Sequence, residues 1–252
     1  MANDEVLEAL GKIASRIPGA VLFWKLWGSR SHNTELPSSD WDYLGVYQAP
    51  TDMILSLHPP PETADNAEGQ KPDFQAHEIR KFCQLLMKGN PGIIEMLFTE
   101  KFVYESPSWL EIKAHRKSFL TQNSVRQYLG YAEGQLKKLF AHSGDGGLHT
   151  KGGKYSEKWA YHLVRLLQDA RRIAQGGEPI VWKEDGEERR LLMRIRTGEM
   201  PQGIVEANAR VLLAEIDSMK PWKLPEDGDE MFLNDWLLRM RMEELDESKN
   251  RD

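Results

Sequence analysis

The chain has 252 residues, of which 40% are apolar and 29% charged, a composition typical of a globular protein and not of a disordered one. Its 33 basic and 39 acidic residues give a formal net charge of -6, which argues against a protein that coats nucleic acid through bulk charge. The single cysteine, Cys83, excludes an internal disulfide framework and a cysteine-based zinc site, and it favours a reducing cytoplasm. No apolar run approaches the roughly 18 residues of a membrane span. The acidic N-terminus predicts no signal peptide.

The first hundred residues mix strand-like and helix-like patterns. Apolar residues at helical spacing predict a helix over 4–16, which ends before Pro18-Gly19. Short apolar runs bounded by turn residues predict strands over 20–27, 41–47 and 73–78. Polar, Pro-rich and Gly-containing stretches predict a loop over 30–39 and a surface excursion over 57–72. A helix is expected after residue 78, with a break at Asn90-Pro91-Gly92 and a further apolar segment over 93–98.

After about residue 105 the chain is predicted to be mostly helical. The expected helices cover 124–140, 157–174, 188–196, 203–219 and 229–245, with one short strand candidate over 180–182. The pattern therefore predicts an α/β (α+β) protein, with a small mixed sheet flanked by helices followed by a mostly helical part. Three segments are expected: 1–105, 106–225 and an amphipathic acidic tail over 226–252.

The most informative motif is a Gly28-Ser29 turn after the first strand, followed by Asp40-Trp41-Asp42 at the next one. Side chains two apart on a strand share a face, so Asp40 and Asp42 are expected side by side, with Trp41 pointing the other way into the core. Two adjacent carboxylates repel each other unless a cation lies between them, and Mg2+ prefers such hard oxygen ligands. The turn offers backbone N–H groups and a hydroxyl to a terminal phosphate. Together these features predict a site for a nucleoside triphosphate held on metal ions.

These motifs resemble the nucleotidyltransferase superfamily typified by DNA polymerase beta, and more narrowly the RNA repair pathway DNA polymerase beta family. The resemblance spans roughly residues 20 to 200. Three ordered blocks carry it: Gly28-Ser29-Arg30 with Ser39-Asp40-Trp41-Asp42 and Gly45-Val46; Arg80-Lys81-Phe82, Leu85-Leu86, Lys88-Gly89-Asn90-Pro91 and Glu95-Met96-Leu97; and Lys158-x-x-x-His162-x-x-Arg165-Leu166. His32 and Asn33 stand where family members often have an aromatic residue and a glycine. Asn33 is expected to preserve the turn because asparagine tolerates the left-handed conformation.

The resemblance implies a third acid on a neighbouring strand that completes a two-metal site. Asp73 is the first choice because it begins the strand predicted over 73–78, and Glu78 is the alternative. His77 would share the face of Asp73, but a packed or solvated histidine is the simpler interpretation.

The predicted helix over 157–174 carries Lys158, His162 and Arg165 at i, i+4 and i+7, on one stripe that Asp169 and Arg172 extend. A polar stripe opposite an apolar one is usually solvated. The resemblance instead implies that the basic stripe holds the triphosphate tail, with help from Lys154 in the preceding glycine-rich loop. That loop has no phosphate-loop register.

The resulting hypothesis is a metal-dependent nucleotidyltransferase that moves a nucleoside monophosphate from a triphosphate such as ATP to a hydroxyl and releases pyrophosphate. Residues 1–105 would form its catalytic core, and 106–225 would complete the nucleotide site. The metal ligands would be Asp40, Asp42 and Asp73, with Mg2+ or Mn2+, and the nucleotide would contact Gly28, Ser29, Arg30, Lys158, His162 and Arg165. The resemblance implies an RNA or tRNA end as acceptor, and the short apolar runs predict no membrane partner. The alternatives are transfer to a protein hydroxyl (AMPylation-like), transfer to a small molecule, and a silent nucleotide-binding module.

Overall fold

A computed structural model describes residue 8 and residues 11–66, 73–141 and 156–249. The chain forms two compact units that interleave along the sequence. Unit 1 contains 1–87, 99–116 and 229–252, and unit 2 contains 88–98 and 117–228. The three segments expected from the sequence stay predictions as functional domains.

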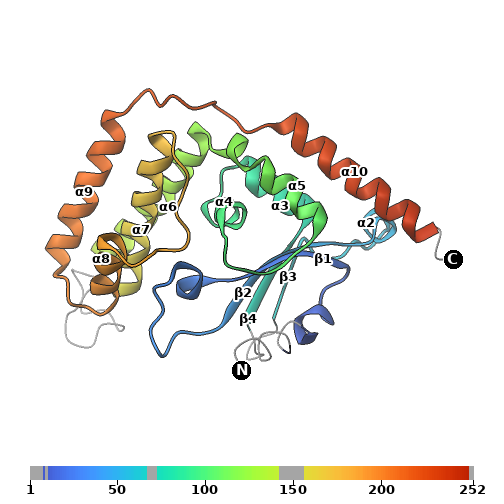
Figure 1. Cartoon of the computed structure of the whole chain (residues 1–252), viewed down its shortest axis with the longest axis horizontal. Coiled ribbons are helices and arrows are strands. Elements are labelled where there is room, and N and C mark those ends of the chain that lie inside the picture. Colours follow the sequence, from blue (N-terminus) through green and yellow to red (C-terminus); the bar gives the residue numbers. More distant parts are fainter. Residues whose placement is uncertain (1–7, 9–10, 67–72, 142–155, 250–252) are drawn as a thin grey trace. The chain divides into compact units, whose positions relative to one another are not determined.

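Unit 1 is built on a five-stranded mixed sheet with the order β3-β4-β2-β1-β5. Figure 1 labels β1 to β4 of this sheet. The strands are β1 (Ala20–Leu26), β2 (Asp42–Gln48), β3 (Thr63–Asp65), β4 (Asp73–Glu78) and β5 (Phe102–Glu105). β2 and β4 run parallel, and every other neighbouring pair is antiparallel. The parallel pair places the first residues of β2 and β4 beside each other at one end of the sheet.

Alternating side chains of β1 build the core on both faces of this sheet. On one face Phe23 stacks on Trp109 with ring centroids 4.4 Å apart, and Phe82 also packs on Trp109. These partners come from α5 (Pro107–Ala114) and α3 (Ile79–Met87). On the other face Trp24 lies over Gly45, where an added Cβ would come within 2.4 Å of the indole. The absence of a side chain at Gly45 therefore leaves room for the Trp24 ring.

The C-terminal helix α10 (Glu230–Lys249) belongs to unit 1 and contacts α2 (Thr51–Leu55) and α3 (Figure 1). Arg241 of α10 pairs with the buried Glu78 at the end of β4 and donates to the Ala49 carbonyl at 2.8 Å. Gln48 donates from Nε2 to the Met240 carbonyl at 2.7 Å. These polar contacts tie the acidic tail predicted over 226–252 to the sheet unit through its described part.

Unit 2 is helical and centres on α7 (Glu157–Ala174), which contacts α6 (Gln122–Ala141), α8 (Glu187–Arg196) and α9 (Gln202–Ser218) (Figure 1). The short helix α4 (Pro91–Phe98) also belongs to this unit and contacts α6. α7 is buried over most of its circumference, including the polar positions Arg165, Gln168 and Asp169. A helix buried in this way needs internal partners for its charges.

The structure confirms the α/β class and most predicted elements. The observed strand β4 and the observed helix α7 have the bounds that were predicted for them, 73–78 and 157–174. The strand candidate over 180–182 is wrong, because these residues form no ladder and lie in an irregular connection. Within the described residues, the sequence patterns did not predict α2, β3, β5, α5 and the 3-10 helix η2 (Arg116–Phe119). The helix predicted over 4–16 is seen in part, with residues 11–14 helical and the earlier positions mostly outside the described residues. Within the described residues, no helix combines the length and apolarity that crossing a bilayer requires.

Candidate active site

The chain turns sharply at Gly28, two residues after the end of β1. Gly28 has φ +64°, a left-handed conformation that costs side-chain-bearing residues energy. It opens the short 3-10 helix η1 (Gly28–His32), which Asn33 closes in the left-handed conformation with φ 57°. The expectation for Asn33 is thus confirmed. The Asn33 N–H donates to the Ser29 carbonyl, and Ser31 Oγ donates to the Gly28 carbonyl at 2.8 Å.

This turn lies against the start of β2. The Trp27 N–H donates to the Asp42 carbonyl at 2.8 Å, one residue beyond the last pair of the β1–β2 ladder, Leu26 with Tyr43. A Cβ added to Gly28 would lie 3.5 Å from Asp42 Oδ2, so the Gly28 backbone and the Asp42 carboxylate are neighbours. A phosphate-binding turn and a metal-binding carboxylate would need this proximity.

Asp42 and Asp73 are register partners at the first positions of the parallel strands β2 and β4. Both are half-buried, and Asp73 Oδ1 accepts a hydrogen bond from Asn66 Nδ2 at 3.4 Å. Residues paired in register have side chains on the same face of a sheet. Two of the three carboxylates expected at the metal site therefore stand side by side beside the Gly28 turn.

Asp40 and Trp41 lie differently from the expectation. β2 begins at Asp42, so both residues precede the strand and the two-residue alternation does not apply to them. Trp41 is 40% exposed, so its predicted place in the core is wrong. Its ring is instead covered by Arg30, whose guanidinium carbon lies 4.0 Å from the ring centroid. Asp40 is exposed, on the segment that leads into β2.

Ser29 and Ser39 link the turn to the segment that carries Asp40. Ser29 Oγ donates to Ser39 Oγ at 3.2 Å, and Ser39 Oγ also accepts the Leu36 N–H at 2.9 Å. Thr34 donates to the Ser29 carbonyl from its N–H at 3.1 Å. These contacts give the loop predicted over 30–39 a defined shape beside β2.

Glu78, the alternative third acid, stands at the far end of β4 from Asp73. It is buried and pairs with Arg241, and its Oε2 accepts the Arg80 N–H at 2.9 Å. Its neighbour His77 is also buried and shares a hydrogen bond with Thr63 Oγ1 at 3.1 Å. Burial lowers the pKa of His77, and the nearby Lys81 lowers it further. Both side chains thus have structural partners, and Asp73 remains the candidate.

Asp42 and Asp73 fit a magnesium ion in donor chemistry and in position, since Mg2+ is usually held by one or two carboxylates together with phosphate oxygens and water. Within residues 8, 11–66, 73–141 and 156–249, no three Asp, Glu, His or Cys side chains already gather at metal-binding distance. Asp40 therefore forms no closed three-ligand cluster with the other two.

The predicted basic stripe of α7 belongs to unit 2, whereas Asp40, Asp42 and Asp73 belong to unit 1. Lys158 is exposed. His162 is mostly buried, and burial, followed by the charges of Arg165 and Lys158, lowers its pKa to about 4, so the ring is neutral at pH 7. Arg165 is buried and pairs with Glu95 of α4. This pairing gives Arg165 a structural role within unit 2.

Arg165 and Glu95 continue into a buried charge network around Asp169. Asp169 Oδ1 accepts hydrogen bonds from Arg172 Nη1 at 2.7 Å, the Ile180 N–H at 3.2 Å and Lys183 Nζ at 3.3 Å. In the sequence analysis, Glu95 stands only in a block that carries the family resemblance and is given no partner. An acid on an otherwise apolar helix was the available signal that it has a buried partner.

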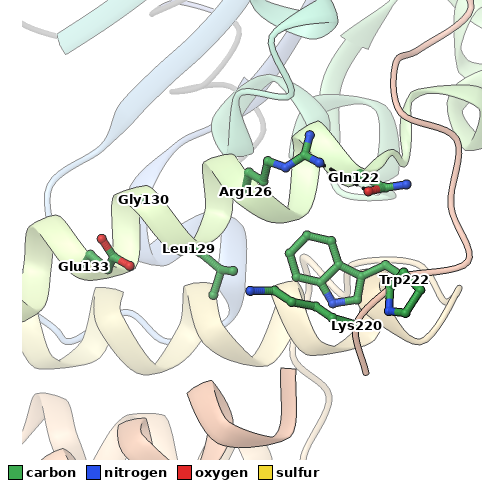
Figure 2. A pocket seen from close by; sticks show the side chains of 8 residues that line it. Gln122, Arg126, Leu129, Gly130, Glu133, Lys220 and Trp222 are labelled. Carbon is green, nitrogen blue, oxygen red and sulfur yellow. Dashed lines mark hydrogen bonds between the residues drawn. The ribbon is translucent and has the colours of Figure 1, made fainter. Parts of the chain in front are cut away.

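Two further features concern the glycine-rich loop predicted before α7 and a pocket of unit 2. Lys154 and its glycine-rich loop lie outside the described residues. A pocket of about 710 Å³ opens in unit 2 beside α6 and is lined by Gln122, Arg126, Leu129, Gly130, Glu133, Lys220, Pro221 and Trp222 (Figure 2). Its cations have acidic partners, Arg126 with Glu226 and Lys220 with Asp217. No predicted site residue lines it.

Comparison with known proteins shows the family of the chain. The model of the RNA repair pathway DNA polymerase beta family, RlaP, matches residues 2–238. No curated protein matches the chain. The matched range covers the Gly28 turn, both paired aspartates and the helices of unit 2. The chain belongs to the RNA repair pathway DNA polymerase beta family, a family of DNA polymerase beta-type nucleotidyltransferases.

Proposed function

We propose that the chain is a metal-dependent nucleotidyltransferase that moves a nucleoside monophosphate from a nucleoside triphosphate, such as ATP, to the hydroxyl of an RNA or tRNA end. In this reaction the hydroxyl oxygen bonds to the α-phosphorus, the bond from that phosphorus to the bridging oxygen breaks, and pyrophosphate leaves. The family supplies the reaction class. The substrate, acceptor and metal are our proposal, as is a cytoplasmic site of action, which rests on the single cysteine.

The observation that carries the proposal is the register pairing of Asp42 with Asp73 directly beside the Gly28 turn. An acidic pair alone is common, and a glycine-serine turn alone is usually only a turn. Here the Asp42 carboxylate is close to Gly28, and Asp73 lies on another strand, 31 positions after Asp42 in the chain. Chain segments so distant converge on one point of the sheet edge, as a phosphoryl-transfer site requires.

The chain's own groups would bind and orient the nucleotide. The N–H groups at the start of η1 would donate to the terminal phosphates, because the first N–H groups of a helical turn lack partners within it. The Ser29 hydroxyl, which donates to Ser39 Oγ in this structure, would donate to them by exchanging that partner. Asp42 and Asp73, with Asp40 joining from the preceding segment, would be the metal ligands. Mg2+ or Mn2+ held there would supply positive charge against the phosphates and polarise the attacking hydroxyl. Lys158 stays a candidate for the triphosphate tail.

A labelling experiment tests the proposal and separates the acceptors. The full chain is incubated with each α-labelled nucleoside triphosphate and Mg2+, in separate reactions with an RNA pool, a protein pool and small-molecule hydroxyl acceptors. The proposal expects label on RNA and release of pyrophosphate. Label on protein would support the AMPylation-like alternative. Nucleotide binding without transfer in any pool would identify a silent binding module and contradict the proposal.

A further inference from the structure

The Arg30 side chain holds the segment that presents Asp40. Its Nη2 donates to the Ser39 carbonyl at 2.8 Å, and its Nε donates to the Asp40 carbonyl at 3.1 Å. Both bonds reach main-chain atoms nine and ten residues away, across the loop that separates η1 from β2. The guanidinium thus joins the turn to the residues just before the first strand position, Asp42.

The flat face of the same guanidinium covers Trp41, at 4.0 Å from the ring centroid. A planar, always-charged group can make two directed hydrogen bonds and a stacking contact at once. A lysine carries the same charge but offers a single donor point, so it reproduces neither the fork nor the stack. This combination fixes three consecutive residues, Ser39, Asp40 and Trp41, relative to the start of η1.

Asp40 needs such a hold because it lies outside the sheet. The β2–β4 ladder begins at the pair of Asp42 and Asp73, and the β1–β2 pairing reaches only to the Trp27 bond with the Asp42 carbonyl. The Ser29–Ser39 hydroxyl bond is a second link over the same gap, between neighbours of Arg30 and Asp40. Together the two links set how far the segment before β2 lies from the turn.

We propose that Arg30 is a positioning residue, which fixes Asp40 and the entry to β2 against the Gly28-Ser29 turn, and is not a ligand of the triphosphate. The inference rests on the proposed function, because the position of Asp40 affects catalysis only if Asp40 acts with Asp42 and Asp73. It differs from the sequence-based expectation, which placed Arg30 among the nucleotide contacts.

The kinetic test compares Arg30→Lys and Arg30→Ala with wild type, with Arg16→Lys, at an exposed arginine of the same unit, as the matched control. A small displacement of a catalytic group can cost up to about 100-fold in rate, so both Arg30 variants are expected to lose about tenfold or more in kcat. Their KM for the triphosphate should change less than about twofold, because ground-state binding is not removed. Recovery of wild-type kcat by the lysine variant, or a raised KM at unchanged kcat, would identify a phosphate contact and overturn the proposal.

Hydrogen exchange gives a second readout that does not depend on turnover. Backbone amides of residues 36–42 should exchange faster in both Arg30 variants than in wild type. Amides of β1 should exchange at the wild-type rate in these variants, and all these amides should exchange at the wild-type rate in the Arg16→Lys control. Unchanged exchange over 36–42 would overturn the positioning role even if activity fell. If wild type itself transfers no nucleotide, the proposed function fails, while the exchange data still decide whether Arg30 holds this segment.

Discussion

Asp42 and Asp73 face each other across the only parallel pair of the described sheet, each at the first residue of its strand. In this position the sheet fixes their spacing by backbone hydrogen bonds, whereas the side chains themselves lie at its edge. A pair held in this way is suited to bind the same ion, because its two carboxylates need little further ordering when the ion arrives. The neighbouring Gly28 turn makes this edge the place where a triphosphate would lie.

The conformation of Gly28 should limit substitutions there. Gly28→Ala is expected to lower the free energy of unfolding by about 1 kcal/mol, because alanine disfavours the left-handed region. Gly28→Asn should lower the unfolding free energy by less, because asparagine tolerates the left-handed region, as Asn33 does in the same turn. Urea denaturation measures both, with Gly134→Ala in α6 as a control that is neutral or stabilising. Equal losses for Gly28→Ala and Gly28→Asn would show that backbone strain is not the cause.

The buried pair of Arg165 and Glu95 should matter for stability. Arg165→Met removes the arginine that pairs with the buried Glu95 carboxylate and is expected to cost about 3 kcal/mol of unfolding free energy. The double variant Glu95→Leu/Arg165→Met should recover a large part of this loss, because it leaves no unpaired charge. Arg126→Met, which breaks the exposed pair with Glu226, is the control and should change stability little. A raised KM for the triphosphate in Arg165→Met, without a stability loss, would instead indicate nucleotide binding.

His162 should make unit 2 sensitive to acid. Its pKa is lowered to about 4 in the folded chain, below the usual 6.5, so the unfolded state binds more protons between these values. The stabilising contribution of neutral His162 is complete above about pH 6.5 and is lost as the pH falls toward 4, by up to about 3 kcal/mol. The unfolding free energy of wild type should therefore fall by up to about 3 kcal/mol relative to that of His162→Gln between pH 7 and pH 4, because only wild type has this imidazole to protonate. A pH-independent difference between them would contradict the lowered pKa.

Cys83 offers a probe of how α10 is attached. Burial, with the nearby Glu78 carboxylate, raises the pKa of this thiol to about 12, so it should react with a thiol reagent only after local opening. Arg241→Met removes the pair with Glu78 and should speed labelling about tenfold or more, the effect of about 1.4 kcal/mol on the opening equilibrium. Arg239→Met, on the same helix with an exposed pair to Glu111, is the matched control. Equal labelling rates in all three chains would show that this pair does not attach the helix.

Local patterns were enough to predict much of the sheet unit. The strand Asp73–Glu78 follows from a short run bounded by turn residues, and the turn at Gly28 follows from a glycine after an apolar run. The place of Trp41 could not be predicted in this way. Its exposure depends on the strand starting one residue later than the pattern suggested and on a contact with Arg30 across the loop.

The charges of α7 show the same limit. Helical spacing correctly put Lys158, His162 and Arg165 on one stripe, but spacing says nothing of what covers that stripe. Arg165 pairs with Glu95, which lies 70 positions away in the chain. Asp169 accepts a hydrogen bond from Lys183, which lies in the irregular connection after α7. The cost of burying a charge makes such distant partners necessary, yet it does not identify them from the sequence alone.

The most direct measurement compares nucleotide transfer by wild type, Asp42→Asn, Asp73→Asn and the control Asp65→Asn, an exposed acid on the neighbouring strand β3. The rate of pyrophosphate release with Mg2+ and an RNA acceptor is followed at saturating triphosphate. The account predicts losses of about 100-fold or more for Asp42→Asn and Asp73→Asn, at unchanged unfolding midpoints, and wild-type rates for Asp65→Asn. Near-normal transfer by either of the first two variants would contradict it.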